Sequence, residues 1–514
     1  MIKPMHAQLR FPTRLMDTVL DKETEFDGNL PEYCPDVIRL IRVDCTPYVD
    51  GCECTADKIH IHGRIVYDVL YETDRRNKLR YCSFTQELRH SVDLPAHELE
   101  NMQASCHATC SKITCKMLSP RRLVLRARLE LHTSACGEAV VSMLSAQPVE
   151  GMFFRTKRVR LDTVPETVGA ETHFDETLPL LQGEKNIGEI IFGSVSLQPP
   201  QITVTNGSAV AKTNAVVKVM YEPEDGEGYC MSAKTVPLSV LLEHDAISES
   251  KRCTVSLEVG AYSVLPELDQ YGESRLLKAS FSVGTKAVLV GSVETELADD
   301  LFAISYENTT AQTDMNVPSI YDIADRSFTV DLKIPAEEPP FTALYDTTVR
   351  AGRMRATPAD GGIELNGVLT VSILGDSRDG IQHRDYSEEF VQFVPVDLPE
   401  MLSGIVADVI PFDVLPTLHA DGSISARVIC NAKLYLYAEQ RVSFLSDITK
   451  QTELNVSDDA YTLAYYFPTR ADDLWSVAKR YRVDPVLLRQ TNPKAFDENG
   501  RLAGNIKTVT VVKG

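Results

Sequence analysis

Cysteine and histidine side chains in the first part of the chain are the groups best suited to bind a metal. They are Cys52, Cys54, Cys106, His107, Cys110 and Cys115. A zinc site needs four nitrogen or sulfur ligands, commonly with a tight cysteine pair at both ends. Cys106 and Cys110 have an acceptable spacing, but Cys52-x-Cys54 supplies no clean second pair. We therefore expect ordinary strand thiols and no metal here.

His60 and His62 alternate along an expected strand and so share one face. Two imidazoles at this spacing could bind one ion. The same spacing describes the solvated face of a strand whose other face holds Ile59 and Ile61. Because no third ligand is visible, we favour the solvated face.

No nucleophile elbow, phosphate-binding loop or dinucleotide fingerprint occurs in the sequence. Acidic residues such as Glu222 and Asp225 fall in expected turns, where solvated charge is the usual explanation. We expect no enzyme activity and no cofactor. An enzyme site in one repeat would require a deep pocket with converging carboxylates or histidines.

The net charge of -21 and the pI near 5.0 argue against nucleic-acid binding, which needs lysine and arginine at phosphates. They also argue against a broad basic surface for anionic lipid. Arg10, Arg14 and Asp17 interrupt the N-terminal region, so no signal peptide is predicted. No run reaches the ~20 apolar residues of a membrane span. We expect a cytosolic protein whose 12 cysteines are mostly reduced.

Strand patterns recur at a period of about 150 residues. Alternating apolar residues lead to Tyr71, and a similar ending reaches Tyr221, 150 positions later. A third copy carries Gly367, which follows Gly63 by 304 positions. Turn signals precede several strands, at Asn206-Gly207, Asp360-Gly361 and Asp421-Gly422.

The pattern predicts a mainly β fold, with three tandem β-sandwich-like repeats and a small α+β domain of βααβ order at the C-terminus. The predicted parts are an N-terminal segment (1–24), repeats at 25–165, 166–312 and 313–450, a linker (451–459) and a C-terminal domain (460–514). Helical periodicity is scarce in the repeats, and one short helix is expected from Pro35 to Arg42. The stiff string Pro31–Asp36 is expected to fix the chain where the first repeat begins, or alternatively to form a partner-binding loop.

The C-terminal domain shows two helix signals between two short strands. Asp472 or Asp473 can cap the first helix, and Asp484-Pro485 is a cap followed by proline at the first helical position. Trp475 is the only tryptophan, and we favour a core position for it over a role as an exposed interface anchor.

This C-terminal segment resembles a LysM domain. The resemblance rests on Asp472, Leu474, Trp475, Ala478, Tyr481, Leu488 and Asn492. Ala471 and Asp473 replace the family's glycine and threonine on the loop that lines the N-acetylglucosamine groove of glycan-binding members. Those two departures weigh against sugar binding.

The upstream region resembles the tandem β-domains of unknown activity that precede LysM in spore-forming Firmicutes. The best-matching stretch is Leu30 to Ile38, followed by the strand from Gly63 to Tyr71. Together with the LysM-like end, the chain resembles spore-envelope morphogenetic proteins of the SipL type. The resemblance implies a protein of the mother-cell cytosol that collects on the forespore surface and binds the morphogenetic ATPase of the spore coat.

Two functions follow from these observations. The first is a non-enzymatic scaffold or adaptor in assembly of the spore coat and cortex, with partner binding through the LysM-like domain. The alternative is a protein that binds peptidoglycan or N-acetylglucosamine oligomers through the same groove. In both cases the expected contact residues flank the groove: Thr469, Arg470, Ala471, Asp472, Asp473, Asn492, Pro493 and Lys494.

Overall fold

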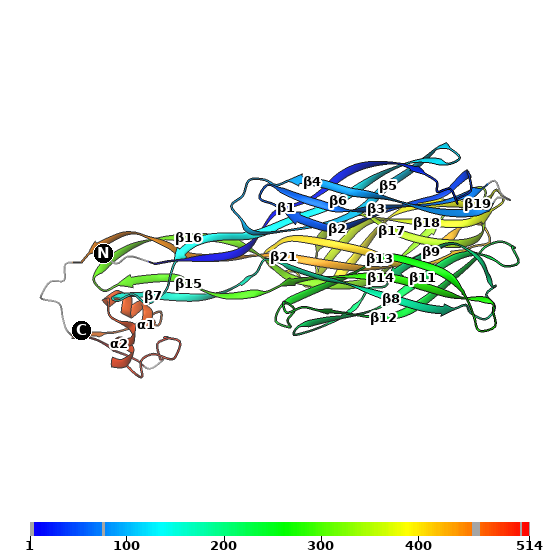
Figure 1. Cartoon of the computed structure of the whole chain (residues 1–514). Helices are drawn as coiled ribbons and strands as arrows, with labels where there is room; N and C mark the ends of the chain where they lie inside the picture. Colours follow the sequence, from blue (N-terminus) through cyan, green and yellow to red (C-terminus); the bar gives the residue numbers. More distant parts are fainter. Residues whose placement is uncertain (1–4, 74–77, 455–462, 504–505, 513–514) are drawn as a thin grey trace.

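The computed structural model describes residues 5–73, 78–454, 463–503 and 506–512. The chain is mainly β with several small sheets, which confirms that part of the prediction. Its long strands run side by side along an elongated body, and two short helices lie at one end (Figure 1). The dipeptides Asn206-Gly207, Asp360-Gly361 and Asp421-Gly422 all lie in turns between strands, with positive φ at each glycine.

The first unit of the body is a sandwich of two three-stranded sheets. One sheet has the order β2-β3-β4 and the other has the order β1-β6-β5, with all neighbours antiparallel. Alternate residues of β3, such as Ile59, Ile61 and Ile65, are buried between the sheets. The strands are β1 (His6–Asn29), β2 (Val37–Cys54), β3 (Lys58–Thr73), β4 (Leu79–Asp93), β5 (Glu100–Ser119) and β6 (Arg122–Leu144).

The same strand order occurs in two further units. In the second unit, β9 and β10 together occupy the position that β2 has in the first. Its strands are β8 (Glu166–Pro179), β9 (Ile187–Leu197), β10 (Gln201–Thr205), β11 (Ser208–Pro223), β12 (Cys230–Glu243), β13 (Arg252–Leu268) and β14 (Ser274–Val290). Those of the third unit are β16 (Tyr306–Ile334), β17 (Phe341–Ala359), β18 (Gly362–Ser377), β19 (Gly380–Pro395), β20 (Leu402–Leu418) and β21 (Ile424–Glu453).

Three antiparallel ribbons extend beyond the sandwiches and form a stalk. Two ribbons are continuations of the first and last strands of a unit, β1 with β6 and β16 with β21. The third is β7 (Met152–Asp162) with β15 (Ser292–Ala303), which continue β8 and β14 of the second unit. The ribbons share one apolar core: Leu9, Phe11, Met143, Val159, Leu161, Leu297, Val317, Val442 and Phe444. The stalk therefore joins the three units through their first and last strands.

At the opposite end of the sandwiches the units meet around a shared centre. Arg42, Phe192 and Asp346 occupy matching positions, because each follows a β-bulge and stands opposite the corresponding residue of its middle strand. Arg42 forms ion pairs with Asp346 at 2.9 Å and with Asp44 at 2.8 Å, and its guanidinium lies 4.7 Å from the Phe192 ring centroid. Burial acts to lower the pKa of Arg42, but the two carboxylates outweigh that effect and raise it.

The C-terminal part of the chain, residues 463–512, is called the terminal module below. Strand β22 (Leu463–Tyr466) pairs antiparallel with β23 (Val509–Val512), and the helices α1 (Leu474–Tyr481) and α2 (Pro485–Thr491) lie between them in sequence. Buried residues from both helices and from β23 form its core.

Several predicted boundaries fall inside strands. The position 24/25 lies within β1, 312/313 within β16, and residues 451–453 of the expected linker complete β21. The remainder of that linker, residues 455–459, lies outside the described residues.

The helix predicted from Pro35 to Arg42 is wrong, because β2 begins at Val37 and pairs with β3. Two register shifts, between Val37 and Arg39 and between Leu40 and Arg42, explain the error. A β-bulge adds a residue to one strand, so apolar residues recur at three- and four-residue intervals, as they do on a helix.

Replacing Arg42 by Met should lower the free energy of unfolding by about 3–5 kcal/mol, because it leaves Asp346 buried without its counter-charge. Urea unfolding followed by circular dichroism measures the change. Adding Asp346→Leu to the Arg42→Met variant should restore most of the lost free energy of unfolding, because no unpaired charge then remains buried. Arg427→Ala, which removes an exposed ion pair with Asp331, is the matched control and should change little. Equal losses for the Arg42 and Arg427 variants would contradict this assignment.

Candidate functional site

The loop before α1 contains five of the residues expected to contact a partner, and two of them hold the loop together. The Asp472 carboxylate accepts hydrogen bonds from the Thr469 amide at 2.7 Å, the Thr469 hydroxyl at 2.9 Å and the Tyr466 hydroxyl at 2.8 Å. Asp473 caps α1, accepting from the Ser476 amide, while the Ser476 hydroxyl lies 2.8 Å from the Asp473 amide. This reciprocal arrangement is a capping box.

Asn492 is also committed to the fold. Its side-chain amide donates to the Leu488 and Thr510 carbonyls and accepts from the Thr510 amide, at 2.7–2.9 Å. It therefore joins the end of α2 to β23. The three side chains Asp472, Asp473 and Asn492 shape the surface and are not free to bind a partner.

The remaining predicted contact residues are exposed: Thr469, Arg470, Ala471, Pro493 and Lys494. Asp473 of the loop before α1 forms an isolated β-bridge with Arg501, but within the described part of the chain no hydrogen bond or ion pair joins this loop to Pro493 or Lys494. The module is basic, with eight Lys and Arg against five Asp and Glu over residues 463–512 of a chain whose net charge is -21. Its exposed surface therefore favours an acidic partner.

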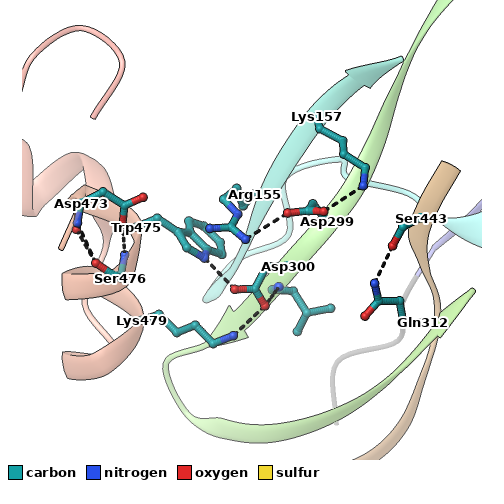
Figure 2. Close-up of polar contacts among 11 residues, drawn as sticks. Arg155, Lys157, Asp299, Asp300, Gln312, Ser443, Asp473, Trp475, Ser476 and Lys479 are labelled. Carbon is teal, nitrogen blue, oxygen red and sulfur yellow. Dashed lines mark hydrogen bonds and ion pairs between the residues drawn. The ribbon is translucent and has the colours of Figure 1, made fainter. Parts of the chain in front are cut away.

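Trp475 binds the module to the stalk, a contact that sequence reasoning did not find. Its indole Nε1 donates to the Asp300 carboxylate at 2.8 Å, and its ring packs edge-on against Phe302 with centroids 5.0 Å apart. Lys479 forms an ion pair with the same carboxylate at 2.6 Å (Figure 2). Arg482 donates to the Tyr306 carbonyl at 2.8 Å.

This docking contact explains the single tryptophan in a way that neither sequence interpretation described. Trp475 is half-buried, and it packs with Phe302 in the same apolar cluster as the module core. It is therefore an anchor whose partner belongs to the same chain. The sequence showed Trp475 at the start of a short helix and the acidic pair Asp299 and Asp300 near the end of a strand. No local pattern linked the two.

Eight of the nine cysteines of the first unit lie in its core or pack against it. Cys34, Cys45 and Cys82 are buried there, Cys52, Cys106 and Cys110 pack against them, and none of the twelve cysteines forms a disulfide. A hydrogen bond between Cys45 and Cys110 raises the pKa of the former and lowers that of the latter. Burial raises the pKa of Cys52 to about 12. Within the described residues, no group of three or more His, Cys, Asp or Glu side chains is arranged to hold a metal ion.

The other chemical candidates lie apart from one another. His60 and His62 are exposed, whereas Ile59 and Ile61 are buried. Glu222 was expected in a solvated turn, but it is buried in β11 and forms an ion pair with Lys78 of the first unit at 2.6 Å. The exposed Asp225 forms an ion pair with Lys185 at 2.7 Å. Glu222 therefore contributes to contact between units.

A cavity of about 340 Å³ lies where the three ribbons leave the sandwiches. Register shifts at Arg14/Met16 and Ile320/Asp322, and the break between β7 and β8, bend the ribbons around it. Its charged groups are largely engaged: Asp162 accepts from Ile320 and Arg252, and Arg14 pairs with Asp17. We interpret the cavity as space left by the bends.

Neither helix of the described residues has the length and hydropathy needed to cross a bilayer.

Comparison with known families identifies one region. Residues 36–118 match the family model described as SipL, SPOCS domain. The match begins one residue before β2 and ends one residue before the end of β5, so it takes in four of the six strands of the first unit. It supports a SipL-type, sporulation-related protein. No curated protein and no solved structure matches the chain.

Replacing Asp300 by Ala should release Trp475 from the stalk and move its fluorescence to longer wavelength, because the indole loses its acceptor and becomes more exposed. Acrylamide quenching should increase as well. Asp299→Ala is the matched control, because the neighbouring carboxylate binds Arg155 and Lys157 instead of Trp475 (Figure 2). An equal response in the two variants would contradict the docking role of Asp300.

The same contact should depend on pH. Burial acts to raise the pKa of Asp300, but hydrogen bonds from Lys479 and Trp475 outweigh it and lower the pKa below its ordinary value. A lowered pKa in the docked state means that its stabilisation is complete above the ordinary value and is lost as pH falls through the lowered one. Tryptophan emission should stay constant from about pH 8 to 5 and change only below about pH 4. Asp300→Asn should abolish this transition.

Proposed function

We propose that this chain is a non-enzymatic scaffold or adaptor in assembly of the spore envelope. The match of residues 36–118 to the SipL SPOCS domain is the observation that carries the proposal. The resemblance of the terminal module to LysM domains adds a binding element at one end of the body. Weak contacts by such a module gain strength when many copies assemble side by side.

The proposed partner of the terminal module is the morphogenetic ATPase of the spore coat, in the mother-cell cytosol at the forespore surface. Arg470 and Lys494 are the proposed contact cations, since both are exposed and neither forms an ion pair among the described residues. Asp472, Asp473 and Asn492 act indirectly by holding the two flanking segments. A basic surface of this kind would meet an acidic patch on the ATPase.

The alternative partner is peptidoglycan or an N-acetylglucosamine oligomer. The βααβ order of the module and the exposed Thr469 and Ala471 favour it. The acid at Asp473, which caps α1, weighs against it, because the side chain is no longer available to a sugar hydroxyl. We therefore place the protein partner first.

Binding of the full-length chain to the coat ATPase of the same organism, measured by calorimetry, tests the proposal. Arg470→Glu and Lys494→Glu should each weaken binding about tenfold or more, since they place like charges against an acidic surface. Lys116→Glu makes the same charge change on exposed β5 of the first unit and should leave binding unchanged.

N-acetylglucosamine oligomers form the second arm of this experiment. Binding of the oligomers without binding of the ATPase would overturn the protein-partner proposal and establish the glycan alternative. Binding of the ATPase that is insensitive to both charge reversals would move the contact away from the terminal module.

A further inference from the structure

The body has two ends of different character. Strands β1 and β16 start in the stalk and β8 continues the stalk strand β7; all three end at the opposite tip, which we call the far end (Figure 1). The described loops there span 30–36, 120–121, 180–186, 224–229, 269–273, 335–340, 378–379 and 419–423. From Arg275 at this end to Phe302 in the stalk the chain extends roughly 90 Å at the usual strand rise. The terminal module lies against the stalk, at the other end.

One loop of the far end presents an aromatic side chain on a rigid support. The Arg121 guanidinium donates to the carbonyls of Pro31 and Cys34 at 2.8 and 2.9 Å, and forms an ion pair with Asp36 at 2.9 Å. Cys34 points into the core, whereas Tyr33 at the apex is 87% exposed. The Pro31–Asp36 string is thus fixed in place, and its tyrosine faces solvent.

The second unit builds the same loop without the aromatic ring. Arg275 donates to the carbonyls of Leu181 and Glu184, both at 2.9 Å, as Arg121 does in the first unit. The residue at the apex is Gly183, with φ of 99°. Because this loop closes with no side chain at the apex, the ring of Tyr33 is not needed for the fold. A large exposed aromatic on a rigid loop is typical of an interaction anchor.

The far end is also strongly acidic. Its described loops carry twelve Asp and Glu against three Lys and Arg. Two of the three cations, Arg121 and Lys185, already form ion pairs with Asp36 and Asp225. A surface with this charge attracts a basic partner.

The terminal module offers the complementary surface. Residues Leu463, Tyr465 and Phe467 follow one another at two-residue spacing, and their exposed fractions are 49%, 64% and 72%. Leu463 and Tyr465 lie on the outer face of the β22–β23 pair, whose inner face covers the module core, and Phe467 directly follows β22. The surrounding module is basic, as described above. Exposed apolar side chains on a basic surface fit an acidic surface that presents an aromatic anchor.

We infer that the far end of one copy of this chain binds the outer sheet face of the terminal module of a second copy. Tyr33 supplies the apolar anchor, and the acidic loops meet the basic module. The two surfaces lie at opposite ends of one chain, so each contact leaves one free surface at either end of the pair. Contacts of this head-to-tail kind grow into open chains unless a rotation closes them. The inference does not depend on the identity of any other partner.

Sedimentation velocity of the full-length protein over a range of concentrations tests the inference. The weight-average mass should rise from 57.1 kDa and pass the dimer value without a plateau. Added salt should reverse the rise, because the contact pairs opposite charges at exposed surfaces. A protein that stays monomeric at all concentrations would overturn the inference, whereas a stop at a dimer would mean that two such contacts close a ring.

Complementation between two variants gives a sharper result. Tyr33→Ser removes the anchor of the far end, and Tyr465→Ser alters the module face, so each variant alone should remain monomeric. An equimolar mixture should form a heterodimer and stop there, since only one intact surface of each kind remains. Tyr321→Ser is the control, because Tyr321 is 48% exposed on β16, in neither surface, and its variant should assemble like the parent chain. A mixture that stays monomeric would overturn the inference.

Discussion

The arrangement of the three units depends on a charge that has been removed from water. Arg42 is buried where the units meet, and its ion pair with Asp346 joins residues of the first and third units, while Phe192 of the second covers the guanidinium. A buried guanidinium is costly unless its counter-charges are in place. Any packing of the sandwiches that separates these positions leaves the charge unmatched. The contact therefore favours one order of units around the centre, in addition to the apolar cluster that surrounds it.

Local patterns in the sequence predicted much of the fold. Alternation of apolar residues indicated the strands, and the Asn-Gly and Asp-Gly pairs marked turns, because these depend on neighbours only a few positions away. The 304-residue spacing from Gly63 to Gly367 matches the spacing of Leu70 and Leu374, which stand opposite Arg42 and Asp346. The bulges at the start of β2 interrupted the alternation of apolar residues and produced a spacing typical of a helix. Contacts such as that of Trp475 with Asp300 join residues 175 positions apart, and no local pattern predicts them.

The candidate site shows a similar division. The sequence indicated which loops flank the terminal module, and several of their residues are exposed. It could not separate side chains that build the loops from those that face solvent, because Asp472, Asp473 and Asn492 are polar in either role. Only their hydrogen bonds distinguish them. Because the module docks on the stalk through Trp475, only the surfaces that the stalk leaves uncovered can bind a partner. The same contact fixes the orientation of those surfaces relative to the body.

The pairing of first and last strands has a consequence for biosynthesis. His6 stands opposite Leu144, and Tyr306 stands opposite Glu453. The sheet β1-β6-β5 of the first unit and the sheet β16-β21-β20 of the third therefore cannot form until the final strand of the unit has left the ribosome. Pairing over such sequence separations is slow, and the waiting strand presents an unpaired edge. The stalk requires all three units, so its core is completed only when β21 has been synthesised. A chain truncated before β21 would leave two ribbons without the third and would be a substrate for chaperones and proteases.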